Sequence, residues 1–427
     1  MPDSFTTPSG YRVLRADELP SVIATAGDAA LHLGGSAAQW HAKEVSDGNM
    51  NAVYRLEGPS GSIIVKQALP YIRVIGESWP FPVTRIAFET EALKYHQRIA
   101  PQFVPTIIHS DDALGLLVME DLRHHRVARH AFVDGRTFPH FARQMGAFLA
   151  HSLYYSSDFH LSTPEKKALA ASFAGNAHLC QTTEDVIFTG PYADRELNRV
   201  TAGNETIAAE LRADQDLKRA ASEMKYVFRT KSEALIHGDL HTGSVMVTED
   251  DTRVIDAEWA LHGPMGFDLG ALIGNLFLAA ISQPGHATAE NDRDEAAEWM
   301  LQAAADVWEH FSARFLRLAE EDASEFFAPD VLSSADRQAI VAGHLRSVLA
   351  DAIGFAGAKM IRRIIGISHV EDFERISDVP LRARLESHAL RTARRLLLER
   401  NDLTSIAEAI AILREEALET SADRVRP

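Results

Sequence analysis

The segment from Ile236 to Val247 has the residue pattern in this chain that is best suited to chemistry. It reads Ile-His-Gly-Asp-Leu-His-Thr-Gly-Ser-Val-Met-Val, so apolar residues flank a polar loop that contains Asp239. We expect the flanking residues to hold this carboxylate at the edge of a packed core. There it can accept a proton from a substrate hydroxyl and orient that oxygen toward a γ-phosphate. The alternative is a turn in which Asp239 only hydrogen-bonds to the backbone.

A second acidic cluster, Asp256 and Glu258, follows the apolar residues Val254 and Ile255. Two carboxylates at positions i and i+2 after a strand point the same way and can share a divalent cation. Phosphoryl transfer needs such a cation to neutralise the β- and γ-phosphates. A solvated acidic pair is the alternative, but the apolar residues 259–261 that follow do not indicate open surface.

Lys66 ends the apolar run 63–66, and a lysine in this position can contact the α- and β-phosphates of a nucleotide. A carboxylate from a nearby helix would then position the ammonium. Glu89 and Glu91 are the candidates, and we favour Glu89. Alternatively, Lys66 is an edge residue that reaches water. The preceding segment 46–51, where a phosphate-covering loop would lie, contains a single glycine and is a weak glycine-rich loop.

The residues before 120 predict a small α+β lobe. Two runs rich in β-branched and aromatic residues, 51–57 and 61–66, enclose a Gly-Pro-Ser-Gly turn and predict a hairpin. A helical pattern covers 84–100 and ends at a proline. Two further strand-like runs follow at 104–109 and 114–119. These elements would place Lys66 on a sheet and Glu89 on the helix beside it.

The rest of the chain is mostly helical in pattern, apart from the polar cluster between 234 and 260. A length of 427 residues allows two domains that share a cleft. We therefore predict an α+β, bilobal fold with a small antiparallel-sheet lobe and a larger, mostly helical lobe. The predicted boundaries are 1–119 for the first lobe, 120–122 for a hinge and 123–427 for the second lobe.

Charge and composition restrict the partners. The formal net charge is −17, which argues against nucleic acid as a general partner and requires a local island of Lys, Arg and metal for any nucleotide. Cys180 is the only cysteine, so no internal disulfide can form. We see no secretion signal, and the longest apolar stretch, 269–281, is interrupted and too short to span a bilayer. We expect a cytoplasmic protein without a membrane partner.

Taken together, these segments resemble the methylthioribose kinases, which are relatives of choline kinases and aminoglycoside phosphotransferases within the protein-kinase-like fold. The resemblance runs through most of the chain. The segments that carry it are Asp47–Asn49, Ile64–Tyr71, Gly76–Pro80, Met119–Leu122, His237–Ser244, Asp256–Glu258, Gly263–Asp268 and Ile353–Gly357 with Ile361–Arg363.

The resemblance implies ATP- and Mg²⁺-dependent phosphorylation of the anomeric hydroxyl of 5-methylthioribose, a step of methionine salvage, by a homodimer. Asp239 would be the base and a sugar contact, and Arg362, with Arg363 beside it, would reach the sugar. Trp79 would cover the apolar methylthio group; otherwise it is a buried loop anchor. The residues implied in ATP binding are Asn49, Lys66, the hinge residues Glu120, Asp121 and Leu122, and Asp256, Ala257 and Glu258, of which Asp256 and Glu258 would also hold Mg²⁺.

Two departures from the wider kinase pattern support this branch. The metal-binding Asn that usually follows the catalytic Asp by five residues is Ser244 here, and the usual Asp-Phe-Gly is Asp256-Ala257-Glu258. The methylthioribose branch makes the same exchange, with Glu258 in place of the missing Asn. Adjacent arginines on a helix often end in solvent, but small residues precede Arg362 and favour a packed helix.

Three alternatives stay open from the sequence. One is a kinase of the same fold that acts on another sugar such as 5-deoxyribose. Another is a kinase for choline or an aminoglycoside, although a cationic acceptor needs an acidic or aromatic cage and nothing in the chain marks one. The last is a nucleotide-binding pseudokinase, which the presence of Lys66, Asp239 and Asp256 disfavours.

Overall fold

The hairpin expected after residue 50 forms the centre of a five-stranded antiparallel sheet in the computed structural model, which describes residues 5–45, 50–73, 76–322, 324–328 and 330–422. The strand order is β1-β2-β3-β7-β6. Lys66 on β3 lies opposite Val53 on β2 and Leu117 on β7, so it occupies the middle of the sheet and not an edge. The strands are β1 His41–Glu44, β2 Asn51–Glu57, β3 Ser62–Ala68, β6 Ile107–Asp111 and β7 Leu116–Glu120.

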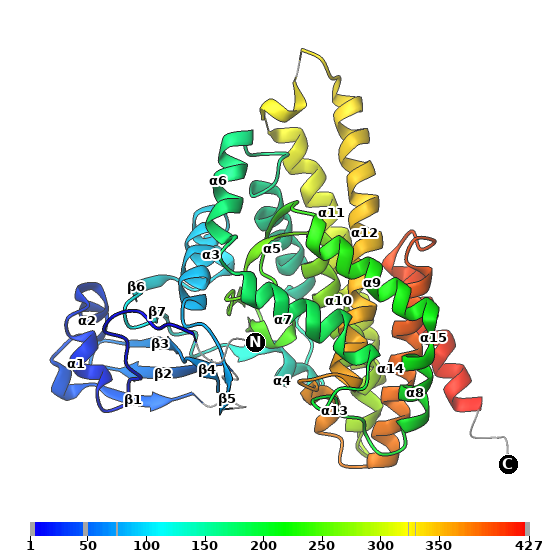
Figure 1. Cartoon of the computed structure of the whole chain (residues 1–427), viewed down its shortest axis with the longest axis horizontal. Coiled ribbons are helices and arrows are strands. Elements are labelled where there is room, and N and C mark those ends of the chain that lie inside the picture. Colours follow the sequence, from blue (N-terminus) through cyan, green and yellow to red (C-terminus); the bar gives the residue numbers. More distant parts are fainter. Residues whose placement is uncertain (1–4, 46–49, 74–75, 323, 329, 423–427) are drawn as a thin grey trace. The chain divides into compact units, whose positions relative to one another are not determined.

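This sheet belongs to the first of two units, Met1–His125 together with Arg253–Ala260. Its core combines residues of the sheet with residues of two short N-terminal helices, coloured dark blue in Figure 1. The other elements of the unit are α1 Leu19–Ile23, α2 Gly27–Leu33, β4 Tyr71–Ile72, β5 Gly76–Pro80 and α3 Arg85–Ile99. The predicted α+β lobe with a single long helix is therefore present.

The segment Arg253–Ala260 packs with the first unit, whereas the predicted second lobe contained it. Arg253 Nη1 donates to the carbonyl oxygen of Val104 at 3.1 Å, and both acidic residues of the segment pair with cations of the first unit. Long-range ion pairs of this kind cannot be read from the order of the elements along the chain. Asp256 and Glu258 thus share one unit with Lys66.

The second unit, Arg126–Thr252 with Leu261–Pro427, is mostly helical. Short strand pairs connect its helices: β8 with β10, and β9 with β12. Together with the first unit this confirms the predicted fold class, a small antiparallel-sheet part and a larger helical part. The helices are α4 Ala128–Val133, α5 Phe141–Tyr155, α6 Thr163–Phe173, α7 Ala177–Phe188, α8 Glu205–Ala213, α9 Gln215–Thr230, α10 Met265–Ser282, α11 Asp294–Glu321, α12 Ser334–Ile365, α13 Glu371–Glu374, α14 Val379–Glu399 and α15 Ile406–Ala422, and the strands are β8 Arg126–Val127, β9 Ala234–Ile236, β10 Val245–Val247 and β12 Leu261–Gly263. Strand β11 Thr252–Val254 begins in this unit and continues into the segment of the first unit that starts at Arg253.

Helices α10 and α12 pack very closely because glycines recur every fourth residue of α10. A Cβ atom at Gly270 would lie 2.4 Å from the carbonyl oxygen of Ala352, and one at Gly274 would lie 2.9 Å from that of Ala356. Gly266 meets α12 in the same way. Residues four apart lie on one face of a helix, so these glycines form a groove for α12. The contact fixes α12, which carries Arg362 and Arg363.

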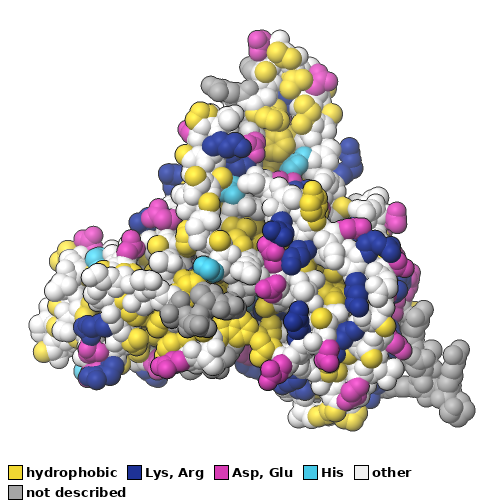
Figure 2. Space-filling model, viewed as in Figure 1, with side chains coloured by type: hydrophobic (Ala, Val, Ile, Leu, Met, Phe, Trp, Pro, Cys, Tyr) yellow, Lys and Arg dark blue, Asp and Glu magenta, His cyan; other side chains and the backbone are white. Residues whose placement is uncertain are grey.

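The apolar stretch 269–281, expected to be too short to span a bilayer, lies within the longer helix α10. By length and composition alone, Met265–His286 and Ser334–Ile365 are long and apolar enough to cross a membrane. The most apolar part of the first segment is wholly buried, and that of the second is 56% buried. Buried core helices of soluble proteins have the same composition, so this is weak evidence for a span. On the face shown in Figure 2, basic and acidic side chains are interspersed over the helical unit.

Candidate active site

The first group of functional side chains surrounds Lys66. Its Nζ donates to Glu89 Oε1 at 2.8 Å and also pairs with Asp256. The preference for Glu89 is confirmed, because Glu91 instead pairs with Lys94 at the surface. Burial acts to lower the pKa of Lys66, but Asp256, Glu89 and Glu258 outweigh it and raise the pKa. Lys66 therefore keeps its positive charge, as a phosphate contact requires.

Three carboxylates of the first unit can hold a cation. Glu89, Asp256 and Glu258 each offer an oxygen, and these atoms lie within 4.8 Å of one another. Hard oxygen ligands of this kind suit Mg²⁺. The expected strand geometry is wrong in detail, because β11 ends at Val254 and Asp256 has a left-handed backbone with a φ of 70°. A turn, not strand alternation, brings the two carboxylates together.

The side chain of Asp256 is 45% exposed, whereas Glu258 is buried. Glu258 accepts hydrogen bonds at Oε2 from Asn51 Nδ2 at 2.8 Å and from Arg85 Nε at 3.1 Å. Neither partner was predicted. The only sequence signal for Arg85 is its place one turn before Glu89 on the same helix. Ala257, between the two acidic residues, is buried.

The predicted hinge residues lie at the end of β7 and directly after it. Asp121 is buried, and its carboxylate accepts from Arg55 at 2.8 and 3.1 Å and from Ser62 Oγ at 2.6 Å. The Asp121 side chain is hydrogen-bonded to residues of the sheet, so we expect an adenine to bind to the backbone of Asp121 and not to its side chain. Leu122 is also buried, and Glu120 accepts from the backbone N–H of Thr106 at 3.0 Å.

Two further predicted residues belong to the first unit by sequence. Asn49 lies outside the described residues. Trp79 lies on β5 with a partly buried side chain. Its indole Nε1 is buried and has no hydrogen-bond partner among the residues that the structure describes. The role of Trp79 stays a prediction.

The second group of functional side chains is centred on Asp239 in the helical unit. Its loop connects β9 to β10, and Gly238 has a left-handed φ of 82° that favours glycine. Asp268, in the first turn of α10, accepts from the backbone N–H groups of His237 at 2.6 Å and Gly238 at 3.0 Å. Ser244 Oγ donates to the carbonyl oxygen of Asp239 at 3.0 Å. The loop is therefore held from both sides.

The carboxylate of Asp239 faces cations. Lys359 Nζ on α12 donates to Oδ1 at 2.7 Å, and His241 Nε2 lies 3.4 Å from Oδ2. Burial acts to raise the pKa of Asp239, but Lys359, His241 and Arg363 outweigh it and hold the pKa well below its usual range. Burial lowers the pKa of His241 to about 3, although Asp239 opposes this, so the imidazole is neutral at pH 7. The side chain of Asp239 is still 27% exposed and within reach of a substrate.

Arg362 and Arg363 differ in their partners. Arg363 Nη1 donates to the carbonyl oxygen of Ser368 at 3.0 Å. Arg362 Nε and Nη1 are buried and have no hydrogen-bond partner in the described part of the chain. Burial lowers the pKa of Arg362. The Asp239 carboxylate raises this pKa, and the Arg129 guanidinium lowers it further. Since buried polar groups are nearly always paired, these N–H groups, like Arg363 Nε, are available to a ligand or to water.

Arg129 was not predicted and completes this basic cluster. It lies on α4, donates from Nη2 to Asn275 Oδ1 at 3.1 Å, and has Nε 3.5 Å from Asp372 Oδ2. A Cβ atom at position 243 would lie 2.9 Å from Arg129 Nη1, so the Arg129 side chain comes close to the backbone of the Asp239 loop. Four cations, Lys359, Arg129, Arg362 and Arg363, thus influence one another around Asp239. They form the local basic island that an anionic reactant needs in an acidic protein.

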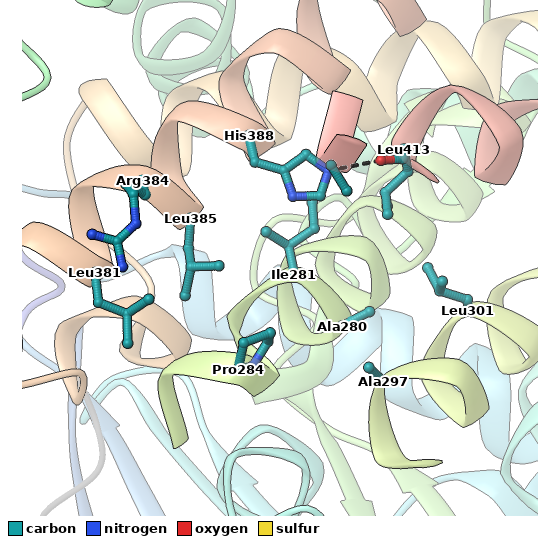
Figure 3. Close-up of a pocket in the computed structure, with 11 residues that line it drawn as sticks. Ala280, Ile281, Pro284, Ala297, Leu301, Leu381, Arg384, Leu385, His388 and Leu413 are labelled. Atoms are coloured by element: carbon teal, nitrogen blue, oxygen red, sulfur yellow. Dashed lines mark hydrogen bonds between the residues drawn. The ribbon is translucent and has the colours of Figure 1, made fainter. Parts of the chain in front are cut away.

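A separate cavity of about 310 Å³ in the helical unit contains none of these residues (Figure 3). Its walls come from α10, α11, α14 and α15 and are mostly apolar. His388 points toward α15, where its Nε2 lies 2.7 Å from the carbonyl oxygen of Leu413. The cavity shares no residue with either functional group and is not the candidate active site.

Comparison with known proteins gives the family. The model of the phosphotransferase enzyme family matches residues 41–305. Methylthioribose kinase 1 of Oryza sativa subsp. japonica is 40% identical over 94% of this chain and 95% of its own length. Methylthioribose kinase of Pectobacterium atrosepticum is 40% identical over 88% of this chain and 92% of its own. The chain belongs to the methylthioribose kinase family.

Membership of this family confirms the resemblance found in the sequence and makes the protein a kinase. The match to the wider phosphotransferase family covers Lys66, Asp239, Asp256 and Glu258 but ends before α12. Arg362 and Lys359 lie beyond the residues that match this family model, whereas the methylthioribose kinases match nearly the whole chain.

Proposed function

We propose that this protein transfers the γ-phosphate of ATP to the anomeric hydroxyl of 5-methylthioribose, giving 5-methylthioribose 1-phosphate for methionine salvage. The observation that carries the proposal is the Asp239 carboxylate, which is ionised, held by Lys359, and accompanied by the unpartnered guanidinium of Arg362. An ionised carboxylate can accept the hydroxyl proton, and a free guanidinium can donate two parallel hydrogen bonds to sugar or phosphate oxygens. The names of the whole-length relatives support the acceptor.

The nucleotide is assigned to residues of the first unit. Lys66 is proposed to contact the α- and β-phosphates. The rest of the nucleotide is proposed to contact Asn49 and the backbone of residues 120–122. Asp256 and Glu258 would hold Mg²⁺, and Ala257 is the residue between them. When bound, the ion neutralises the charge that develops on the β- and γ-phosphates. Trp79 is proposed to contact the methylthio group, and Arg363, beside Arg362, the sugar.

The basic cluster disfavours the cationic acceptors among the alternatives. Choline and aminoglycosides carry positive charge, which Lys359, Arg129, Arg362 and Arg363 would repel in a buried setting where charges are weakly screened. A neutral sugar suffers no such penalty. We further propose a cytoplasmic homodimer, in keeping with the family that the sequence resembles.

The test is a coupled assay of ADP release over a panel of acceptors: 5-methylthioribose, 5-deoxyribose, ribose, choline and kanamycin. We expect the highest kcat/KM with 5-methylthioribose and no acceptor-dependent release with the two cations. A preference for 5-deoxyribose would change the acceptor but keep the mechanism. A preference for choline or kanamycin would contradict the proposal, and ADP release with none of the acceptors would favour a pseudokinase.

A further inference from the structure

Arg85 is a fully buried charged side chain of the first unit, and none of the roles proposed above uses it. Its relative exposure is 0%, and it lies in the first turn of α3, four residues before Glu89. A buried guanidinium is costly unless each of its donors is satisfied. The partners of Arg85 therefore reveal what the residue is for.

All five N–H donors of Arg85 are used by the protein itself. Nη1 donates to the carbonyl oxygens of Leu69 and Pro82, both at 2.8 Å. Nη2 donates to the carbonyl oxygen of Met50 at 3.1 Å and to Asn51 Oδ1 at 2.7 Å, and Nε donates to Glu258 Oε2 at 3.1 Å. No donor is left for a phosphate, so Arg85 is not a nucleotide contact in this arrangement.

Asn51 is hydrogen-bonded to both Arg85 and Glu258, which are also bonded to each other. It accepts from Arg85 at Oδ1 and donates from Nδ2 to Glu258 Oε2 at 2.8 Å. The hydrogen bonds from Asn51 and from Arg85 are made to the same oxygen of Glu258, Oε2. Glu258 also belongs to the group of carboxylates that can hold a cation. The contacts fix the rotation of the carboxylate about its last bond, as outer-sphere partners do for metal ligands.

We propose that Arg85 is a positioning residue that, together with Asn51, fixes the Glu258 carboxylate as a metal ligand. The wider kinase pattern has glycine where this chain has Glu258, so the extra buried negative charge needs a fixed counter-charge. Arg85 supplies it from the helix that also supplies Glu89 to Lys66. This inference rests on the proposed function, since it takes Glu258 to be a ligand of the nucleotide-bound cation.

The test is a titration of the protein with Mn²⁺ in the presence of ADP, followed by electron paramagnetic resonance, without any sugar. Arg85→Gln, Glu258→Gln and the double variant form a cycle, with Arg98→Gln as control because Arg98 is an exposed arginine of the same helix. We expect Arg85→Gln to weaken Mn²⁺ binding about 10–100-fold, the usual effect of removing a partner of a metal ligand. In the Glu258→Gln background the same change should have little further effect, because coupled residues are not additive.

Thermal unfolding of the same variants covers the case in which Arg85→Gln does not fold. That variant leaves a buried carboxylate without its counter-charge, so the double variant should unfold at a higher temperature than Arg85→Gln. Arg85→Lys, which keeps the charge but not the five donors, should bind Mn²⁺ with intermediate affinity. Mn²⁺ affinity of Arg85→Gln or Arg85→Lys equal to wild type, or additive effects in the cycle, would overturn this inference alone. A wild-type protein that binds no Mn²⁺ with ADP would overturn the proposed function as well.

Discussion

The ammonium of Lys359 donates a hydrogen bond of 2.7 Å to Oδ1 of Asp239, the proposed catalytic carboxylate. Lys359 is itself almost fully buried, with 3% of its side chain exposed, and lies over the ring of Phe267 with Nζ 4.7 Å from the ring centroid. Burial lowers the pKa of Lys359, and Asp239 opposes that effect. A buried cation and a partly exposed carboxylate thus stabilise each other, and we expect Lys359 to extend the pH range in which Asp239 is ionised.

Replacing Lys359 by methionine should move the acidic limb of the pH profile of kcat/KM to higher pH. Lys359 is the largest of the influences that hold the pKa of Asp239 down, so without it burial raises that pKa. A base must be deprotonated, and activity would then be lost earlier as the pH falls. Lys167→Met, at an exposed lysine, is the control. An acidic limb in the same place as in the wild type would show that Lys359 does not set the ionisation of Asp239.

Asp239→Asn should lower kcat about 10²–10⁴-fold, the scale of a positioned general base. The amide fills the same space but cannot accept the hydroxyl proton. ATP affinity, measured by calorimetry, should change little, because the proposed nucleotide contacts belong to the first unit. Asp250→Asn changes an exposed aspartate near the same loop and should behave as wild type. Near-native turnover of Asp239→Asn would reduce Asp239 to a structural turn residue.

Local signals predicted the sheet and the chain positions of the proposed chemistry. Strand composition and a glycine-rich turn located the β2–β3 hairpin, and the helical pattern after it placed Glu89 within reach of Lys66. The loop with Asp239 was also evident, because its polar residues interrupt short apolar runs.

Residues that act through long-range contacts were not predicted. Lys359 lies 120 positions from Asp239, and Glu258 lies 173 positions from Arg85, so neither pair leaves a local pattern. One signal was available: Lys359 precedes Arg362 by three residues in a run of small apolar residues, which places both on one face of a helix. The left-handed backbone of Asp256 could not be predicted from the sequence for a different reason, because residues other than glycine rarely adopt that conformation.

Asp256→Asn and Glu258→Gln should each raise the Mg²⁺ concentration needed for half-maximal activity, with activity partly restored at high metal. Each change removes one negative oxygen from a group of ligands that lie within 4.8 Å of one another. Titration of initial rates with Mg²⁺ at fixed ATP measures the effect. Glu91→Gln, on the exposed side of α3, serves as control. Midpoints that stay at the wild-type value in both variants would exclude a shared cation.

Arg362→Ala should weaken the sugar much more than ATP. Loss of a charge-assisted hydrogen bond costs about 1.5–3 kcal/mol, and about 1.4 kcal/mol corresponds to a tenfold change in affinity. Arg362→Lys should restore only part of the loss, because an ammonium lacks the planar fork. Separate titrations with sugar and with ATP, with circular dichroism to check folding, measure the difference. Arg346→Ala, an exposed arginine of the same helix, is the control; equal effects on both ligands would indicate a folding defect.

The position of the phosphate in the product, measured together with ADP, reports the acceptor, the donor and the hydroxyl that Asp239 activates. The purified protein is incubated with 5-methylthioribose, ATP and Mg²⁺, and the product is examined by ³¹P–¹H correlation NMR. We expect a single phosphosugar whose phosphorus couples to the anomeric proton. It should form in an amount equal to that of ADP, and it should be absent with Asp239→Asn. A phosphate coupled to any other proton of the sugar, or ADP formed without a phosphosugar, would contradict the proposed function.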